Sequence, residues 1–319
     1  MPLDDAAMFA MLTPQYRDYM NRLRAARRPA LSDLSAADAR ALMRDMQNGD
    51  VSSYRVASER RELDGFSVLI LRPSGAQGLL PAVVYYHGGG WVLGDADTHA
   101  RMMRELATQS QCAIVFVEYT RAPEASFPQP LEHCYAALQW VAEHGRAAGL
   151  DPSRIAVAGD SAGGNLAAAT ALLARRRGGP AIRMQALLYP ITDCDFTTTS
   201  YRDFESGLNL DMSAMRWFWD RYVPDAEQRT DPLASPMRAS DDELKNLPPA
   251  LVITAECDVL RDEGEAFARR LANAGVPVTA VRFSGTLHAF MMADELANEP
   301  QATSAMSLLA CKLRQALCP

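Results

Sequence analysis

Short runs of apolar, mostly β-branched residues recur along the chain from residue 66 onward, and longer stretches with helical periodicity separate them. This alternation is typical of strands in a mostly parallel sheet that helices cover on both faces. Gly, Pro or Asp residues bound each run and favour turns there. The pattern predicts strands at residues 66–71, 82–86, 113–118, 155–158, 185–189, 251–255 and 278–283, with an eighth near 53–60.

Helical patterns lie between these strands, near residues 98–110, 130–146, 162–176, 262–274 and 301–317. Several of them repeat apolar residues every three or four positions, as amphipathic helices do. Two stretches do not fit the alternation: 1–45 has a helical pattern, and 193–246 is too long for a structureless loop. We therefore expect one domain over residues 1–319, in which about 1–45 and 193–246 form a helical cap over one end of the sheet.

The composition and the net charge of the chain limit the kinds of partner that it can bind. Hydrophobic residues make up 48% of the chain and charged residues 22%, so a large buried core is expected. The formal net charge of −7 opposes binding to nucleic acid. The arginine clusters at 24–28 and 175–177 end helical patterns, where cations complement the helix dipole.

The chain also lacks the signals of a membrane or secreted protein. No apolar run approaches the roughly 20 residues needed to span a bilayer, and Asp4 and Asp5 stand where a secretory signal would carry basic residues. We expect a cytoplasmic protein without stable membrane association.

The sequence Gly159-Asp160-Ser161-Ala162-Gly163 follows a buried strand pattern and precedes a helical one. In this setting G-x-S-x-G forms a sharp turn from strand to helix that exposes the serine oxygen. Small residues on both sides permit the strained backbone, and the helix N-terminus favours negative charge. The alternative is a glycine-rich turn without chemistry, which the strand-turn-helix context disfavours. We expect Ser161 to be a nucleophile.

A glycine-rich loop, His87-Gly88-Gly89-Gly90-Trp91, comes directly after a predicted strand. Backbone N–H groups in such a loop can stabilise a developing oxyanion, usually together with the amide after the nucleophile, here that of Ala162. A phosphate-binding loop is the rival interpretation. The next glycine after Gly90 is Gly94, one residue too late for G-x-G-x-x-G. His87 is expected to brace the loop by hydrogen bonding.

A serine nucleophile needs a base, and the chain contains five histidines. His99, His133 and His144 lie on or near helical patterns, where a structural or surface role is the ordinary one. His288 instead follows the last predicted strand, late in the chain and after a candidate acid. The order Ser, Asp, His is that of enzymes with the G-x-S-x-G turn.

The best candidate for the acid is Asp258, which lies directly after the strand pattern at 251–255. Glu256 and Asp262 are its competitors. Glu256 is closer to the strand, while Asp262 could cap the following helix. Cys257, beside them, is expected to be a packing residue, as are the other cysteines, whose spacing fits neither a disulfide framework nor a zinc site.

Together these motifs closely resemble the hormone-sensitive-lipase-like bacterial carboxylesterases, which have the α/β-hydrolase fold and the motifs HGGGW and GDSAGGN. The resemblance covers nearly the whole chain. It also includes the stretches at 121–124, 231–236, 258–264 and 287–290; Val259 stands where members often have Pro after the acid.

The resemblance implies a triad of Ser161, Asp258 and His288, with oxyanion donors and supporting residues around it. The implied donors are the N–H groups of Gly88, Gly89 and Ala162, and the supporting residues are His87, Gly90 and Asp160. Members often pair through sheet edges, so a homodimer is a candidate assembly.

The expected activity is hydrolysis of short- to medium-chain acyl esters through an acyl-enzyme, with a small-molecule ester as the partner and no metal or organic cofactor. An amidase or deacetylase with the same triad stays open, as does a non-catalytic receptor with this fold.

Two interpretations are open for a set of large apolar residues in the two cap segments. They form either an apolar lid and acyl pocket or plain core between cap helices. The set consists of Trp217, Phe218 and Trp219, with Met8, Phe9 and Tyr16.

Overall fold

A computed structural model describes residues 3–206 and 208–318 of the chain. In this part of the chain the strands are β1 (Val56–Glu62), β2 (Ser67–Pro73), β3 (Leu80–Tyr86), β4 (Ala113–Glu118), β5 (Leu150–Asp160), β6 (Met184–Leu188), β7 (Ala250–Cys257) and β8 (Val278–Leu287). They form one eight-stranded sheet in the order β1-β2-β4-β3-β5-β6-β7-β8. β2 pairs antiparallel with both β1 and β4, and all other neighbours are parallel. The predicted eight-stranded, mostly parallel sheet is confirmed.

The predicted strands are all present, and the main differences lie at the ends of β5 and β8. β5 begins at Leu150, because Leu150 pairs with Leu80 before an irregularity in the register. β8 continues to Leu287, which pairs with Cys257 after an irregularity in β7. These extensions bring the residues that follow β7 and β8 to the same edge of the sheet.

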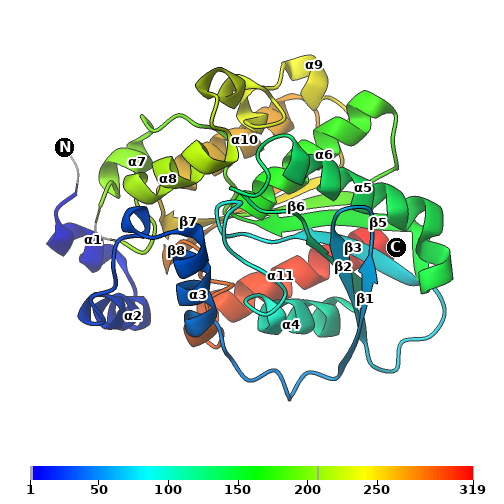
Figure 1. Ribbon diagram of the computed structural model, residues 1–319, viewed down its shortest axis with the longest axis horizontal. Coiled ribbons are helices and arrows are strands. Elements are labelled where there is room, and N and C mark those ends of the chain that lie inside the picture. The colour runs from blue at the N-terminus through cyan, green and yellow to red at the C-terminus, as the bar shows by residue number, and fades with distance from the viewer. Residues whose placement is uncertain (1–2, 207, 319) are drawn as a thin grey trace.

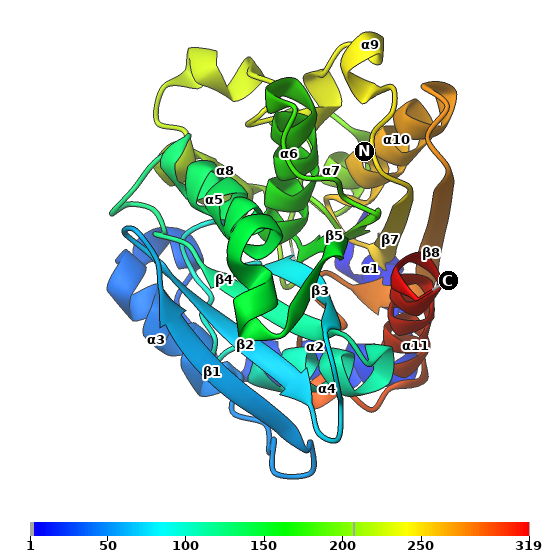
Figure 2. The same cartoon turned by 90° about the vertical axis from the view of Figure 1, so that its right-hand side faces the viewer.

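Helices cover both faces of the sheet. Figures 1 and 2 show α5, α6 and α10 on one face and α4 and α11 on the other. Among residues 3–206 and 208–318, none of the helices combines the length and apolar character that crossing a membrane requires. The bounds are α4 (Ala100–Ser110), α5 (Gln129–His144), α6 (Ala162–Arg177), α10 (Arg261–Asn273) and α11 (Pro300–Leu317).

The helix α6 shows how the sequence shapes one of these elements. It is buried from Ala162 to Ala174 beneath α5 and against β5, which explains its run of alanine and leucine. It ends at Gly178, whose left-handed backbone (φ 59°) is a common helix terminator. The arginines at 175–177 lie in its last turn, as predicted.

The segments at 1–45 and 193–246 contribute the remaining helices. The N-terminal helices lie at the end of the sheet where α7 and α8 are also found (Figure 1), and η1 contacts α8. η4 and α9 instead contact α6 and α10, so the last part of 193–246 packs on the helical layer. The bounds are α1 (Asp5–Met11), α2 (Pro14–Ala25), η1 (Leu31–Asp33), α3 (Ala36–Met46), α7 (Thr199–Asp203), α8 (Met212–Tyr222), η3 (Ala226–Thr230), η4 (Pro236–Arg238) and α9 (Asp241–Leu244), with η2 (Gly145–Ala148) and η5 (Asp294–Leu296) elsewhere.

Candidate active site

Ser161 lies at the sharp turn between β5 and α6, and its backbone is strained (φ 56°, ψ −117°). Such a conformation is costly for a residue with a Cβ and persists only where the surroundings enforce it. The two glycines of the motif make the turn possible. A Cβ at Gly159 would overlap the carbonyl oxygen of Gly163, and one at Gly163 would overlap that of Tyr86. The predicted strand-turn-helix geometry is therefore confirmed.

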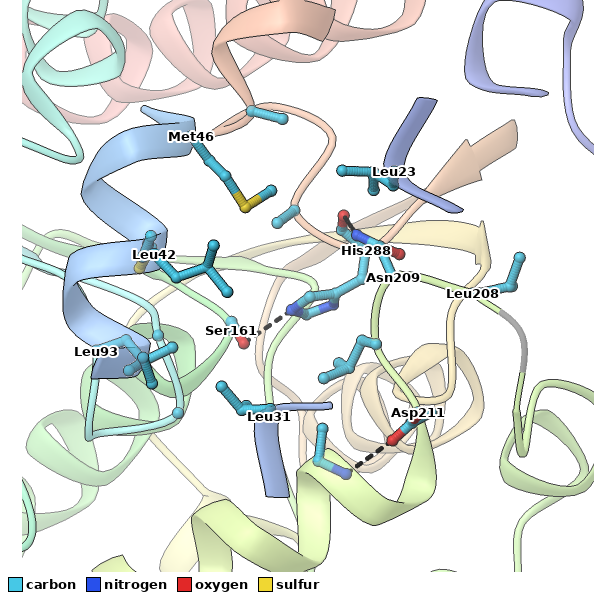
Figure 3. Close-up of a pocket in the computed structure, with 18 of the residues that line it drawn as sticks. Leu23, Leu31, Leu42, Met46, Leu93, Ser161, Leu208, Asn209, Asp211 and His288 are labelled. Atoms are coloured by element: carbon cyan, nitrogen blue, oxygen red, sulfur yellow. Dashed lines mark hydrogen bonds between the residues drawn. The ribbon is translucent and has the colours of Figure 1, made fainter. Parts of the chain in front are cut away.

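His288 lies beside Ser161 at the end of β8, and Asp258 lies beside His288 at the end of β7. The Nε2 atom of His288 is 2.9 Å from the Ser161 hydroxyl oxygen, as the dashed line in Figure 3 shows. Its Nδ1 atom is 2.7 Å from Oδ2 of Asp258. All three side chains are largely buried, and Oδ1 of Asp258 accepts a hydrogen bond from the Leu260 amide. This arrangement is compatible with a Ser-His-Asp triad, in which a base activates the serine and an acid orients the base.

Two further residues hold His288, and the sequence reasoning missed both. The side-chain amide of Asn209 donates a 2.8 Å hydrogen bond to the His288 carbonyl oxygen (Figure 3). The ring of Tyr189 meets the imidazole edge-on, with the ring centroids 5.2 Å apart. Neither residue lies in a motif of the sequence, so only the fold could reveal them.

The competing acids have other partners. Glu256 accepts a hydrogen bond from the Gly285 amide. Asp262 accepts one from the Ser200 amide; it lies within the first turn of α10, which has Leu260 at its N-cap, so the expected capping role is wrong. Burial raises the pKa of the Cys257 thiol to about 12, which keeps it protonated and supports a packing role.

His99, His133 and His144 have partners other than Ser161. His99 contacts Thr98 through Nδ1, and His133 pairs with Gln129 on α5. His144 is exposed at the end of the same helix. The prediction that His288 alone is placed to act as the base is consistent with this geometry.

The glycine loop requires one correction. The amide of Gly88 donates a 3.0 Å hydrogen bond to Oδ1 of Asp160, so it is not free to bind an oxyanion, and its predicted role is wrong. Gly89 and Gly90 line the cavity with Ser161 instead, and both have left-handed backbones (φ 103° and 60°). Within the described chain, the amides of Gly89, Gly90 and Ala162 have no hydrogen-bond partner.

Asp160 is a buried carboxylate directly before the nucleophile. Besides the Gly88 amide it accepts a 2.9 Å hydrogen bond from the Tyr85 hydroxyl, and His99 Nε2 is 3.5 Å away. Burial acts to raise the pKa of Asp160, but the His99 ring and the Tyr85 hydroxyl outweigh it, and the pKa lies below its usual value. Asp160 therefore carries a charge that these donors stabilise.

His87 stabilises the glycine loop through a hydrogen bond, as predicted. Its Nδ1 atom donates to the Gly88 carbonyl oxygen at 2.8 Å, and its ring stacks on Tyr119 with centroids 4.2 Å apart. Burial, together with the nearby His99, lowers the pKa of His87 to about 3. The ring is therefore neutral near pH 7 and acts as a hydrogen-bond donor in the loop.

Ser161 and His288 open into a cavity of about 510 Å³. Its walls come from α2, η1, α3, the segment at 208–218 and the glycine loop (Figure 3). Of the aromatics in question, Phe218 lines this cavity. Trp219 packs on Trp91, with ring centroids 4.9 Å apart, and Met8 and Tyr16 are buried in the core. Phe218 thus fits the interpretation as part of the pocket, whereas Trp219, Met8 and Tyr16 fit the interpretation as core.

Comparison with known proteins agrees with the fold and the motifs. Residues 83–292 match a family described as having the alpha/beta hydrolase fold. The chain belongs to this family, in its hormone-sensitive-lipase-like branch. It is similar to carboxylesterase NlhH of Mycobacterium tuberculosis, with 43% identity over 66% of this chain and 67% of the relative. An arylesterase of Saccharolobus solfataricus is 39% identical over 66% of this chain and 68% of its own length.

A solved structure resembles almost the whole chain. It is that of a thermostable esterase from Pseudomonas putida, with a TM-score of 0.95 and 43% identity, covering 97% of this chain and 98% of that one. The likeness includes the segments outside residues 83–292, so the helices around the cavity also have a counterpart in an esterase.

Proposed function

We propose that this chain is a carboxylesterase that hydrolyses short- to medium-chain acyl esters with Ser161 as its nucleophile. That it is a serine hydrolase of the carboxylic-ester type follows from its family and its esterase relatives. The observation that carries the residue assignment is the pair of hydrogen bonds that His288 makes next to an apolar cavity: Nε2 accepts from the Ser161 hydroxyl, and Nδ1 donates to Asp258.

In the proposed reaction, His288 Nε2 takes the proton of Ser161 while the serine oxygen attacks the ester carbonyl carbon. The tetrahedral intermediate collapses, and the alcohol leaves with the proton from His288. Water then attacks the acyl-enzyme, again with His288 as the base, and releases the carboxylic acid. Asp258 holds the imidazole in the required tautomer and stabilises its charged form without taking the proton.

The amides of Gly89, Gly90 and Ala162 are the proposed oxyanion donors. Gly89 and Gly90 lie in the cavity beside the serine, and Ala162 provides the first amide of α6, where the helix dipole favours negative charge. Each such donor is typically worth about 3 kcal/mol of transition-state stabilisation. The Gly88 amide instead holds the loop through Asp160.

The size of the substrate is proposed from the cavity. A volume of about 510 Å³ with mostly aliphatic walls suits a small ester rather than a long-chain triglyceride. The helices α2 and α3 and the segment at 208–218 supply most of these walls, so we assign the cap role to them.

Hydrolysis of p-nitrophenyl esters of increasing acyl length tests the proposal. Activity should peak at short or medium chains and fall by several orders of magnitude in Ser161→Ala. Ser307→Ala, an exposed serine on α11, is the matched control and should keep full activity. The p-nitroanilides of the same acids measure amide cleavage. Faster turnover of the anilides than of the esters would show that the enzyme is an amidase. Activity retained in Ser161→Ala would overturn the assignment of Ser161 as the nucleophile.

A further inference from the structure

Methionines gather on the wall of the catalytic cavity. Of the 15 methionines in the chain, five line the cavity: Met20, Met43, Met46, Met215 and Met292. They come from α2, α3, α8 and the loop after His288, segments that are far apart in the sequence. Figure 3 shows Met46 extending from α3 toward the space above Ser161. Ester hydrolysis by a serine does not use sulfur, so we relate these methionines to the substrates that the cavity binds.

Methionine differs from leucine in how it fills space. Its side chain is unbranched, has three rotatable bonds and ends in a polarisable thioether, so it can adapt to irregular shapes at little cost. Leucine of similar volume is branched and has fewer rotamers. A wall with several methionines therefore has no single preferred shape, and methionine is common at surfaces that bind varied partners.

The backbone beneath these side chains is held firmly, so adaptation falls to the side chains. On α3, Arg40 donates to the carbonyl oxygens of Val92 and Ala122 at 2.8 and 2.9 Å. Beneath the last methionine, the buried Arg101 donates to the carbonyl oxygens of Met291 and Met292 at 2.7 and 3.0 Å. The cavity thus combines a fixed frame with flexible walls.

We propose that the cavity takes esters whose hydrocarbon groups differ widely in shape, including branched and bulky ones, because its methionines rearrange around each substrate. This inference rests on the proposed esterase function and names the substrate class of that site. The occupant is a neutral, mostly aliphatic ester group. Discrimination between linear and branched isomers of one acyl group is accordingly weak.

The test uses sets of isomeric p-nitrophenyl esters: butanoate with 2-methylpropanoate, and hexanoate with 2-ethylbutanoate and 3,3-dimethylbutanoate. Each kcat/KM is divided by the rate constant for hydroxide hydrolysis of the same ester, which removes intrinsic reactivity. In the wild-type protein the corrected values within a set should agree to within about 10-fold, because shape differences in a rigid apolar pocket cost at least that much.

The variant Met43→Leu/Met46→Leu/Met292→Leu keeps volume and apolar character while stiffening the wall. It should keep one isomer of each set near the wild-type value and lose about 10-fold or more on the others. Met184→Leu/Met306→Leu, on β6 and α11 and outside the cavity lining, is the control and should keep the wild-type profile. Thermal unfolding verifies that both variants are folded.

The outcomes separate this inference from the esterase assignment. A wild-type enzyme that cleaves esters but discriminates isomers by more than about 10-fold would overturn the flexible cavity alone. So would a triple variant with an unchanged profile. No cleavage of any ester would overturn both proposals.

Discussion

At the scale of single residues, the buried charge of Asp160 is the least expected feature of the site. A negative group near an oxyanion should oppose catalysis unless its charge is directed elsewhere. Asp160 accepts hydrogen bonds from Gly88 and Tyr85, with His99 Nε2 3.5 Å away, and its bond to Gly88 fixes one end of the glycine loop. The carboxylate thus sets which amides of the loop face Ser161.

Replacing Asp160 tests this positioning role. Asp160→Ala leaves the Gly88 amide without its acceptor, and we expect kcat to fall by about 100-fold, comparable to the loss of an oxyanion donor, with little change in KM. The affinity for a trifluoromethyl ketone, which forms an oxyanion on the serine, should fall in parallel. Tyr85→Phe removes another donor to the same carboxylate and is the control, with nearly normal kcat. A normal kcat in Asp160→Ala would rule the role out.

His87 gives a pH-dependent prediction. Its pKa falls from 6.5 to about 3 on folding, so below pH 6.5 the unfolded chain binds a proton that the folded protein does not. The contribution of His87 to the free energy of unfolding is therefore fully present above pH 6.5. It decreases as the pH falls toward 3, by up to about 1.4 kcal/mol per pH unit.

Denaturant unfolding between pH 4 and 7 measures this effect. His87→Asn keeps a nitrogen donor for the loop and removes the titration, so its stability should fall less steeply with acid than that of the wild-type protein. The other titrating groups are present in both proteins. Parallel curves would show that His87 does not carry the acid sensitivity.

At the scale of elements, the packing of α6 against β3 depends on one glycine. A Cβ at Gly163 would overlap the backbone oxygen of Tyr86, which cannot move without disturbing the sheet. We expect Gly163→Ala to destabilise the protein by about 3 kcal/mol. Gly178→Ala, at the other end of α6, meets open space and only the strain of φ 59°, so about 1 kcal/mol is expected. Denaturant unfolding measures the free energy of unfolding of both variants, and so compares steric overlap at Gly163 with backbone strain at Gly178. Equal losses of stability would contradict the packing argument.

The elements also explain which parts of the site were predictable. Ser161, Asp258 and His288 each follow a strand, and parallel strands end at one edge of a sheet, so sequence order alone brought them together. The direction in which a peptide unit faces depends on its acceptors. The acceptor of the Gly88 amide is the side chain of Asp160, which the sequence pattern does not reveal, so the predicted role of this amide is wrong. Asn209 was missed because its contact with His288 depends on how the segment at 208–211 packs, and no motif reports that.

At the scale of the whole molecule, the N-terminal helices are tied to the catalytic part at several points near the cavity. Arg40 binds the backbone near the glycine loop and pairs with Glu124, lowering the pKa of that carboxyl to about 2 through its hydrogen bonds. The amide of Gly49 donates to Asp294 at 2.7 Å, beyond the end of α3. These bonds support the proposal that α3 is a fixed wall of the cavity in a single domain.

Loss of the Arg40 contacts should therefore alter substrate binding more than chemistry. Arg40→Met keeps the aliphatic stem but removes the donors to Val92 and Ala122, and we expect KM for p-nitrophenyl butanoate to rise about 10-fold with kcat changed much less. Arg44→Met, on the same helix, breaks only a half-exposed pair with Asp95, which is worth about 0–1 kcal/mol, and should leave both constants unchanged. If Arg40→Met instead lowered kcat at constant KM, α3 would act on the catalytic groups themselves, and its proposed role in substrate binding would be wrong.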